Sequence, residues 1–280
     1  MDAKMEKIIK AIKEKTAMPA YKLELVKDSA PDIFDSKIGG VPYWDLSKEY
    51  PTSSNGNKLM LLAQINFTKA ALEDERLPRK GMLQFFIASD DDVYGMDFDE
   101  ADSQADYRVV FHEEIDLSVT EDAVVDLDIP IATDDDMDMD CTPIMREATL
   151  TFQKAEAYIG PSVAGFEAIF KEVVEEQLGE TLEDEESFEY LEEEEYNEMC
   201  GELGNTGHWL LGYPFFTQSD PREYEDNPYY DALLFQLDSE MDDGEDFVLW
   251  GDCGVGNFFM NSEDLKNGNF SKVMYNWDCY

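Results

Sequence analysis

The sequence has few of the residues from which most catalytic and metal sites are built. It contains only two histidines, His112 and His208, and four cysteines in 280 residues. Two histidines are too few for a histidine-based metal site, and the cysteines form neither the close pairs of a zinc site nor a Cys-x-x-Cys redox motif. The sequence therefore predicts no cofactor and no bound metal, and it predicts that the cysteines are free thiols.

Long apolar runs are also missing. No stretch approaches the ~20 apolar residues that a membrane-spanning helix needs, and the charged start of the chain has no apolar export segment behind it. These absences predict a cytoplasmic protein without membrane association. Hydrophobic residues still make up 43% of the chain and aromatic residues 12%, which is enough for a packed core without disulfides.

Positive charge is scarce and unevenly distributed. The chain has 21 Lys and Arg against 65 Asp and Glu, which gives a formal net charge of −44. Residues 1–90 hold 14 basic and 13 acidic side chains, whereas residues 91–204 hold 4 and 37, and residues 205–280 hold 3 and 15. Such a surface repels phosphates within the ~8–10 Å that physiological salt allows, so nucleic acid and anionic lipid are poor partners. The acidity is either a solubilising coat or an adaptation to a salty cytoplasm, or it is a surface that attracts a basic protein or binds divalent cations.

The most informative positive feature is an internal repeat. Pro42 recurs as Pro214 and Gln64 recurs as Gln236, both 172 positions later. Three blocks match in the same order, namely 40–44 with 212–216, 61–66 with 233–238, and 81–91 with 254–264, the last with one extra residue. Three matched blocks at nearly one offset indicate a duplication. The prolines predict turns that enter strands, and a buried glutamine must find hydrogen-bond partners, so Gln64 and Gln236 are expected to brace matching turns.

Hydrophobic periodicity predicts strands and helices in alternation. The strands are expected at 21–26, 59–67, 82–88, 107–112, 148–159, 233–237 and 247–250, with a weaker one at 124–131. The helices are expected at 3–16, at 162–178 with Ser162 as N-cap, and at 183–202, with a helical turn at 68–75. The dipeptide Asp243-Gly244 is typical of a hairpin.

We therefore expect one domain, 1–280, of the α+β class that is mainly β. It would be an antiparallel roll-like sheet built from two repeats about a pseudo-twofold axis, with an N-terminal helix and acidic surface helices. Repeat one spans about 38–91 and repeat two about 210–264, with a C-terminal tail at 265–280. Inserted strands and acidic helices fill about 92–204.

Two further patterns were weighed as sites. Asp136, Asp138, Asp140 and Glu147 imitate a calcium loop, yet Cys141 stands where that loop needs glycine, and strands flank it where helices are required. An EF-hand is excluded, and loose cation binding stays open. His112 is expected to be a half-exposed sheet residue, whereas His208 is the better candidate for a functional base.

The C-terminal part combines polar and aromatic residues with glycines, which allow close backbone approach to a ligand or to another strand. These residues could line a groove: His208, Trp250, Asp252, Cys253, Asn257, Asn276, Trp277 and Asp278. The alternative is packing where the two repeats cross. Asp252 and Asp278 precede Cys253 and Cys279, and a neighbouring carboxylate raises the pKa of a thiol, which favours inert cysteines.

Several of these blocks together resemble a known family. They are Gly40-x-Pro42-x-Trp44, Leu62–Asn66, Gly81-x-Leu83-Gln84-Phe85-Phe86, Trp250-Gly251-Asp252-Cys253-Gly254 and Tyr275-Asn276-Trp277-Asp278-Cys279. The chain is similar over most of its length to the YwqG-like family, a bacterial domain of unknown function. The resemblance implies a mainly β, roll-like domain in a bacterial cytoplasm, and it supplies no catalytic residues.

Two functions follow as alternatives. The first is a non-enzymatic interaction module that presents its acidic surface to a basic partner protein. The second is an enzyme or small-ligand-binding protein whose groove is formed by the segments 250–257 and 276–278. The residues do not decide whether the protein is an enzyme, and they indicate neither a substrate nor an oligomeric state.

Overall fold

The computed structural model describes residues 3–132, 141–182, 186–224 and 229–280. In this part of the chain the structure is mainly β, and all strand pairs are antiparallel. Ten strands form one sheet: β1 (Met18–Val26), β2 (Lys37–Ile38), β3 (Met60–Asn66), β4 (Met82–Ile87), β5 (Tyr107–His112), β6 (Ala148–Ala157), β7 (His208–Leu210), β8 (Ala232–Asp238), β11 (Val255–Met260) and β12 (Met274–Asp278). A separate hairpin contains β9 (Glu240–Asp242) and β10 (Glu245–Val248).

The described helices are short apart from three. They are α1 (Ala3–Thr16), α2 (Phe67–Ala70), α3 (Glu121–Val125), α4 (Phe166–Leu178), α5 (Ser187–Tyr190), α6 (Glu193–Leu203), α7 (Pro221–Tyr224) and α8 (Ser262–Lys266). No helix in the described ranges is both long and apolar enough to cross a bilayer.

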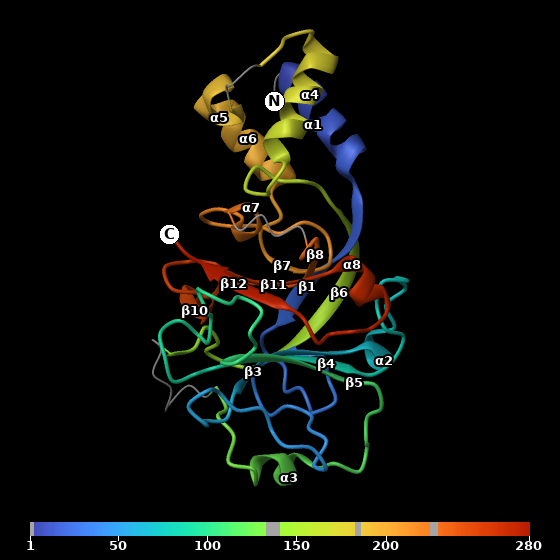
Figure 1. Ribbon diagram of the computed structural model, residues 1–280, viewed down its shortest axis with the longest axis vertical. Helices are drawn as coiled ribbons and strands as arrows, with labels where there is room; N and C mark the ends of the chain where they lie inside the picture. The colour runs from blue at the N-terminus through green and yellow to red at the C-terminus, as the bar shows by residue number, and fades with distance from the viewer. Residues whose placement is uncertain (1–2, 133–140, 183–185, 225–228) are drawn as a thin grey trace.

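The large sheet nearly closes on itself into a barrel-like form. Its strand order is β12-β11-β8-β7-β1-β6-β2-β3-β4-β5, so β5 and β12 are its two ends. These ends approach each other because the Tyr107 hydroxyl on β5 donates a hydrogen bond to the Val273 carbonyl at 2.6 Å, and the Tyr107 ring lies 5.1 Å from that of Tyr275. Figure 1 shows the two halves of the sheet as stacked layers joined by the long strands β1 and β6.

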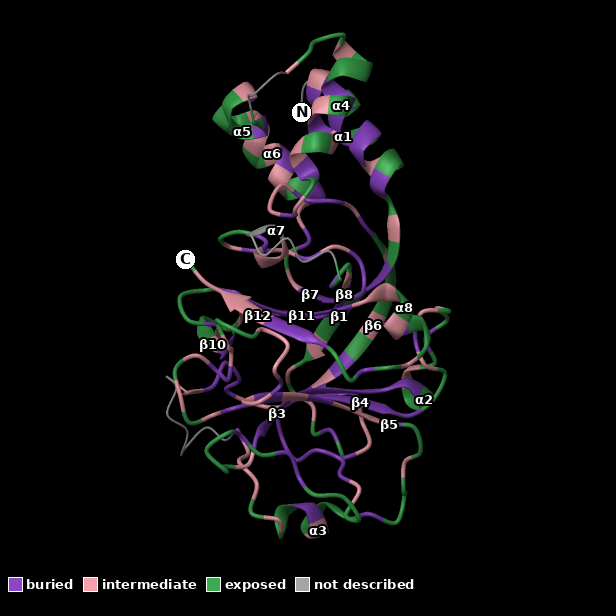
Figure 2. Cartoon of the chain, viewed as in Figure 1, coloured by how far each residue is buried: buried purple, intermediate pink, exposed green. Residues whose placement is uncertain are grey.

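The core of the sheet lies between these two layers. Phe85 of β4 stacks on Phe235 of β8 with 4.7 Å between ring centroids, and its ring lies 4.8 Å from that of Phe258 of β11. All three rings are fully buried, and each contributes about 1.5–3 kcal/mol relative to an exposed ring. Strands β3 and β4 are buried along their whole length (Figure 2), as expected for strands covered on both faces.

The helices α1, α4, α5 and α6 form a second core at one end of the molecule (Figure 1). Met5, Ile8, Ile9 and Ile12 of α1 are buried there, which confirms the predicted amphipathic helix. Lysines on its flanks pair with the acidic helices, for example Lys13 with Glu202 at 2.6 Å. The glutamate-rich helices therefore bury a narrow apolar stripe and leave their acidic side chains outside.

Several predicted elements need correction. The strand predicted at 124–131 is wrong, because Thr120 caps a helix there by accepting a hydrogen bond from the Ala123 N–H at 3.3 Å. The apolar residues of this segment lie in α3 and the following loop, and they pack against a buried hydrophobic cluster from there. The predicted helix 183–202 is two helices in its described part, separated by the extended residue Leu191. Ser162 is not an N-cap, since α4 begins after Gly165 and the Ser162 hydroxyl accepts from the Phe216 N–H at 3.2 Å.

Two further expectations also differ from the structure. Asp243-Gly244 forms the predicted hairpin turn, but it joins β9 to β10, and the strand predicted at 247–250 is β10, which ends at Val248 and lies in a separate two-stranded sheet. His112 is buried, not half-exposed, because the rings of Tyr43 and Trp44 meet it edge-on at 5.2 and 5.1 Å. Burial lowers the pKa of His112 to about 4.

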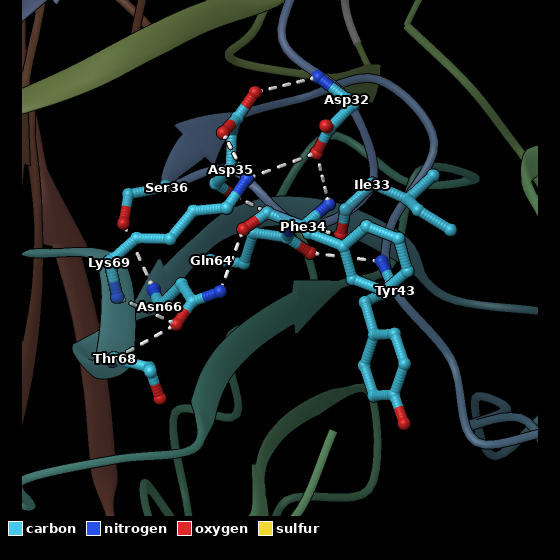
Figure 3. Close-up of polar contacts among 10 residues, drawn as sticks. All are labelled: Asp32, Ile33, Phe34, Asp35, Ser36, Tyr43, Gln64, Asn66, Thr68 and Lys69. Atoms are coloured by element: carbon cyan, nitrogen blue, oxygen red, sulfur yellow. Dashed lines mark hydrogen bonds and ion pairs between the residues drawn. The ribbon is translucent and has the colours of Figure 1, made fainter. Parts of the chain in front are cut away.

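Gln64 and Gln236 make three equivalent hydrogen bonds, and Gln64 Oε1 accepts a fourth from the Gln84 amide at 3.1 Å. Gln64 Oε1 accepts from the Tyr43 N–H at 3.1 Å, and its amide donates to the carbonyls of Ile33 and Asp35 at 2.9 and 2.8 Å (Figure 3). Gln236 Oε1 accepts from the Phe215 N–H at 2.8 Å, and its amide donates to Asn205 and Gly207 at 2.7 Å each. Each partner of Gln236 stands 172 positions after the corresponding partner of Gln64. Each glutamine thus fixes the turn before its strand.

Neighbouring contacts follow the same spacing. The Asn66 N–H donates to Ser36 Oγ at 2.9 Å, and 172 positions later the Asp238 N–H donates to His208 Nδ1 at 3.0 Å. Strand pairing is also irregular at equivalent positions, since the register shifts at Leu62 of β3 and, 172 positions later, at Leu234 of β8.

Candidate functional site

His208, the predicted base, is held in a buried hydrogen-bond network. Its side chain is 3% exposed. Nδ1 accepts from the Asp238 N–H, so Nε2 carries the hydrogen that Glu240 accepts at 2.7 Å. This bond from His208, together with one from Lys27, holds the pKa of Glu240 at about 2. His208 is therefore well placed to orient Glu240.

The two predicted tryptophans pack against each other. Trp250 is fully buried, and its ring lies 6.1 Å from that of Trp277, which in turn lies 4.9 Å from that of Tyr94. A Cβ on Gly256 would overlap the Trp250 ring, so the glycine lets the indole lie directly on β11. Trp250, Trp277 and Tyr94 therefore form an aromatic cluster that packs on β11.

The predicted polar residues lie on the other face of the sheet. Asn257 and Asn276 are paired across β11 and β12, and Asn257 donates to the Phe215 carbonyl at 3.0 Å. Asp278 accepts from the N–H groups of Thr217 and Gln218 at 3.2 and 3.0 Å, and burial raises its pKa. Because side chains alternate along a strand, these three face away from Trp277.

The remaining two predicted residues, Asp252 and Cys253, are exposed in the turn before β11. The structure thus brings together the two tryptophans on one face and the two asparagines on the other, and it places His208 apart from both pairs. A cavity of about 580 Å³ adjoins Asp278 and includes Cys200, Thr217 and Tyr280, but none of the eight predicted groove residues lines it. The groove stays a prediction.

The calcium-like pattern can be followed only in part. Asp136, Asp138 and Asp140 lie outside the described residues, while Glu147 faces a lysine. Within the described ranges, no group of three His, Cys, Asp or Glu side chains is arranged to hold a metal ion.

A second cavity, of about 430 Å³, gathers three cationic side chains of this acidic protein. Lys27 follows β1, Lys37 lies in β2, and Arg146 precedes β6. Arg146 is one of only four basic residues between positions 91 and 204. Glu121 and Glu147 are the acidic residues of the described lining. We call this cavity the Lys37 pocket.

Lys37 is the unusual member of this pocket. Its side chain is 1% exposed, and Glu147 is the one carboxylate in the described ranges within ion-pair distance, with 3.6 Å from Lys37 Nζ to Glu147 Oε2. That separation is too long for a good hydrogen bond, although an ammonium group has three donors. Burial lowers the pKa of Lys37, opposed by the attraction of Glu147.

Gly40 makes room for this contact. It has φ +68°, and a Cβ at that position would overlap the Glu147 carboxylate. Only a residue without a side chain lets Glu147 reach across the turn toward Lys37.

The β9–β10 hairpin positions the other two cations. Lys27 pairs with Glu240 at 2.6 Å and Arg146 with Asp242 at 3.3 Å, and both cations lie over the Phe247 ring. Because Glu240 also accepts from His208, the predicted histidine orients one wall of the pocket through Glu240 and Lys27.

The sheet contains a second position equivalent to that of Lys37. The strands β1 and β6 lie at the centre of the sheet, with β7 beside β1 and β2 beside β6. Lys37 of β2 lies opposite Thr149 of β6, and in the same way Trp209 of β7 lies opposite Lys22 of β1. Trp209 packs there in an apolar cluster with Ala20. The sheet thus accepts a large apolar side chain at this position, so the fold itself does not require a buried ammonium group.

Sequence reasoning missed the Lys37 pocket, although one signal was present. Lys37 and Trp209 are separated by the repeat spacing of 172, just before the matched blocks 40–44 and 212–216. A lysine at one of these positions and a tryptophan at the other indicate that the two positions do not have the same role.

Comparison with known proteins identifies a family and gives no activity for it. Residues 36–279 match the family described as "Domain of unknown function (DUF1963)", and this match includes Lys37, Arg146, Gln64 and Gln236. No curated protein matches the chain. The match spans most of the sequence, and the chain therefore belongs to the DUF1963 family.

Proposed function

We propose that this protein binds a small anionic molecule in the Lys37 pocket. The observation that carries the proposal is Lys37 itself: a buried ammonium group on a cavity wall, with one carboxylate at 3.6 Å, at a position where the other half of the sheet holds Trp209. A buried charge is costly unless it is paired and hydrogen-bonded. Anionic oxygen atoms would supply acceptors for the three donors of Lys37, whose one carboxylate partner in the described ranges is Glu147.

Size and charge narrow the ligand class. The pocket volume of about 430 Å³ lies within the ~300–1,000 Å³ of typical small-molecule sites. The net charge of −44 repels polyanions, but salt screens this repulsion beyond about 8–10 Å, so a small anion can still enter and be held by short-range contacts. Glu121 and Glu147 add acceptors for a ligand that also carries a donor group.

The proposal is tested by thermal shift and calorimetric titration with phosphate, pyruvate and citrate. We expect at least one of these to stabilise the protein, by about 2.7 kcal/mol at a concentration of 100 times its Kd. Arg146→Gln is expected to weaken that binding about tenfold or more, since a hydrogen bond to a charged group contributes about 1.5–3 kcal/mol.

Arg79→Gln is the matched control, because Arg79 lies outside the described lining of the pocket and donates to the Leu72 carbonyl. It should leave ligand affinity unchanged. The proposal fails if none of the three anions stabilises the protein, or if Arg146→Gln and Arg79→Gln have equal effects.

A second proposed function is binding of a basic protein by the acidic helices α4 and α6. It is supported by the way these helices already hold the lysines of α1: Lys15 pairs with Glu172 and Glu176 at 3.0 and 3.1 Å, and Lys4 pairs with Glu195 at 3.8 Å. The outward glutamates of the same helices could pair with the lysines of another chain in the same way.

This second function is tested with a lysine-rich helical peptide at increasing NaCl concentrations. Glu175→Gln with Glu194→Gln, on the exposed side of α4 and α6, should weaken binding several-fold at low salt. Asp122→Asn with Asp126→Asn on α3, at the opposite end of the molecule (Figure 1), removes the same charge and should not. Equal weakening by both pairs, or binding that salt does not affect, would contradict a specific docking face.

We also propose that the two halves of the sheet derive from one ancestral unit. The shared glutamine contacts, the shared register shift and the symmetric strand order all support a duplication. The YwqG-like resemblance and a bacterial cytoplasmic setting stay predictions, as does the division of the chain into repeats within one domain.

A further inference from the structure

We propose that Lys37 is a reactive amine that forms an imine with a small 2-oxo acid bound in the Lys37 pocket. The inference rests on the proposed function, because it assigns the class of anion and its chemistry. It names Lys37 as the residue that bonds to the ligand and Glu147 as the group that moves the proton.

The surroundings of Lys37 suit a nucleophilic amine. A lysine attacks a carbonyl carbon only in its neutral form, and an exposed lysine is almost entirely protonated at neutral pH. Burial of the Lys37 side chain favours the neutral amine, and one acceptor at 3.6 Å offsets this only in part. Nothing comparable surrounds Lys154, which is 64% exposed and pairs with Glu73 at 2.6 Å.

The chemistry balances without an oxidant or a reductant. The Lys37 nitrogen bonds to the carbonyl carbon as the carbonyl π electrons move to oxygen, and a proton passes from nitrogen to that oxygen by way of Glu147. Loss of the hydroxyl as water then breaks the C–O bond and leaves a C=N bond. Glu147 relays the second nitrogen proton to the departing hydroxyl in the same way, so water leaves and a neutral imine remains. A proton taken up from solvent then protonates the imine, which the negative charge of Glu147 stabilises.

The other cations favour a 2-oxo acid over a simple aldehyde. Lys27 and Arg146 line the same cavity and are fixed by the β9–β10 hairpin, so they can hold a carboxylate while the adjacent carbonyl meets Lys37. A planar guanidinium group matches a carboxylate in two parallel hydrogen bonds. A ligand without the carboxylate would lack this second anchor.

The experiment traps the imine chemically in the full-length protein. Pyruvate and sodium cyanoborohydride are added near neutral pH, intact mass counts the adducts, and peptide mapping locates them. We expect one carboxyethyl group per chain, on Lys37. Lys37→Met should abolish this adduct, Lys154→Met should retain it, and Arg146→Gln should slow labelling about tenfold.

The outcomes separate this inference from the function on which it rests. Adducts scattered over exposed lysines, or labelling that survives Lys37→Met, would overturn the assignment of Lys37. Stabilisation by pyruvate without any adduct would overturn the imine and leave anion binding intact. Absence of the adduct together with absence of stabilisation by phosphate, pyruvate and citrate would overturn the two together.

Discussion

Replacing Gln64 by leucine is expected to lower the free energy of unfolding by about 3–5 kcal/mol. Leucine has a similar size, but it would leave the Tyr43 N–H and the carbonyls of Ile33 and Asp35 without their partner inside the protein. Each buried polar group left unsatisfied costs about 1–3 kcal/mol. Urea denaturation should show the loss as a lower midpoint with an unchanged slope.

Gln236→Leu should cost a similar amount, because it removes the equivalent bonds to Phe215, Asn205 and Gly207, whereas Gln64→Leu also removes one bond from the Gln84 amide. Gln153→Leu is the control, since Gln153 is exposed on β6 and its replacement should change stability by about 0.5 kcal/mol or less. A cost below ~1 kcal/mol for Gln64→Leu would mean that the turn does not depend on this side chain. Unequal costs for the two glutamines would argue against equivalent halves.

Replacing Lys37 by methionine is expected to stabilise the fold by about 1–3 kcal/mol while abolishing ligand binding in the Lys37 pocket. Methionine has a similar length and needs no hydrogen-bond partner, and the equivalent position already holds the apolar Trp209. Glu147, left without its cation, is 38% exposed and can be solvated by water. If Lys37 is kept for function at a cost in stability, its replacement should give a protein that is more stable but no longer binds the ligand.

The stability gained by Lys37→Met should depend on pH. The pKa of Lys37 is lowered by folding from 10.5, so between that lowered pKa and 10.5 the unfolded chain binds more protons than the folded one. Stability of the wild type therefore rises with pH across this window. The advantage of Lys37→Met should be largest below the window and disappear near pH 10.5.

Lys154→Met is the control for this second result, because Lys154 is exposed and its loss should change stability by about 0.5 kcal/mol or less. Urea denaturation of both variants and the wild type at several pH values gives the comparison. A Lys37→Met protein that is several kcal/mol less stable would show that the ammonium group supports the fold, and the functional assignment would be lost.

Much of the fold could be predicted because local patterns and long-range packing agree. The apolar strands β3, β4 and β8 and the amphipathic helix α1 lie where their periodicity places them. The predicted strand at 124–131 failed for the opposite reason. Its alternating apolar residues face a cluster that a short helix and a loop can also cover, and the cap from Thr120 favours the helix.

The candidate site was harder to predict than the fold. The residues of the Lys37 pocket come from four separate stretches of the chain, around positions 27–41, 121, 131–132 and 145–147. No local motif records that these stretches meet. The spacing of the aromatic C-terminal residues is distinctive, yet Trp250 and Trp277 pack against each other, and Gly256 lets the Trp250 ring lie on β11.

The nearly closed sheet has a consequence for how this protein can meet other chains. An open sheet can bind a partner by strand addition, in which backbone groups at an edge pair with an incoming segment. Here β5 and β12 face one another through Tyr107, Val273 and Tyr275, so an incoming strand would first have to displace the opposite edge. Recognition at the large sheet must therefore depend on side chains and pockets, and the same closure protects this sheet against edge-to-edge aggregation.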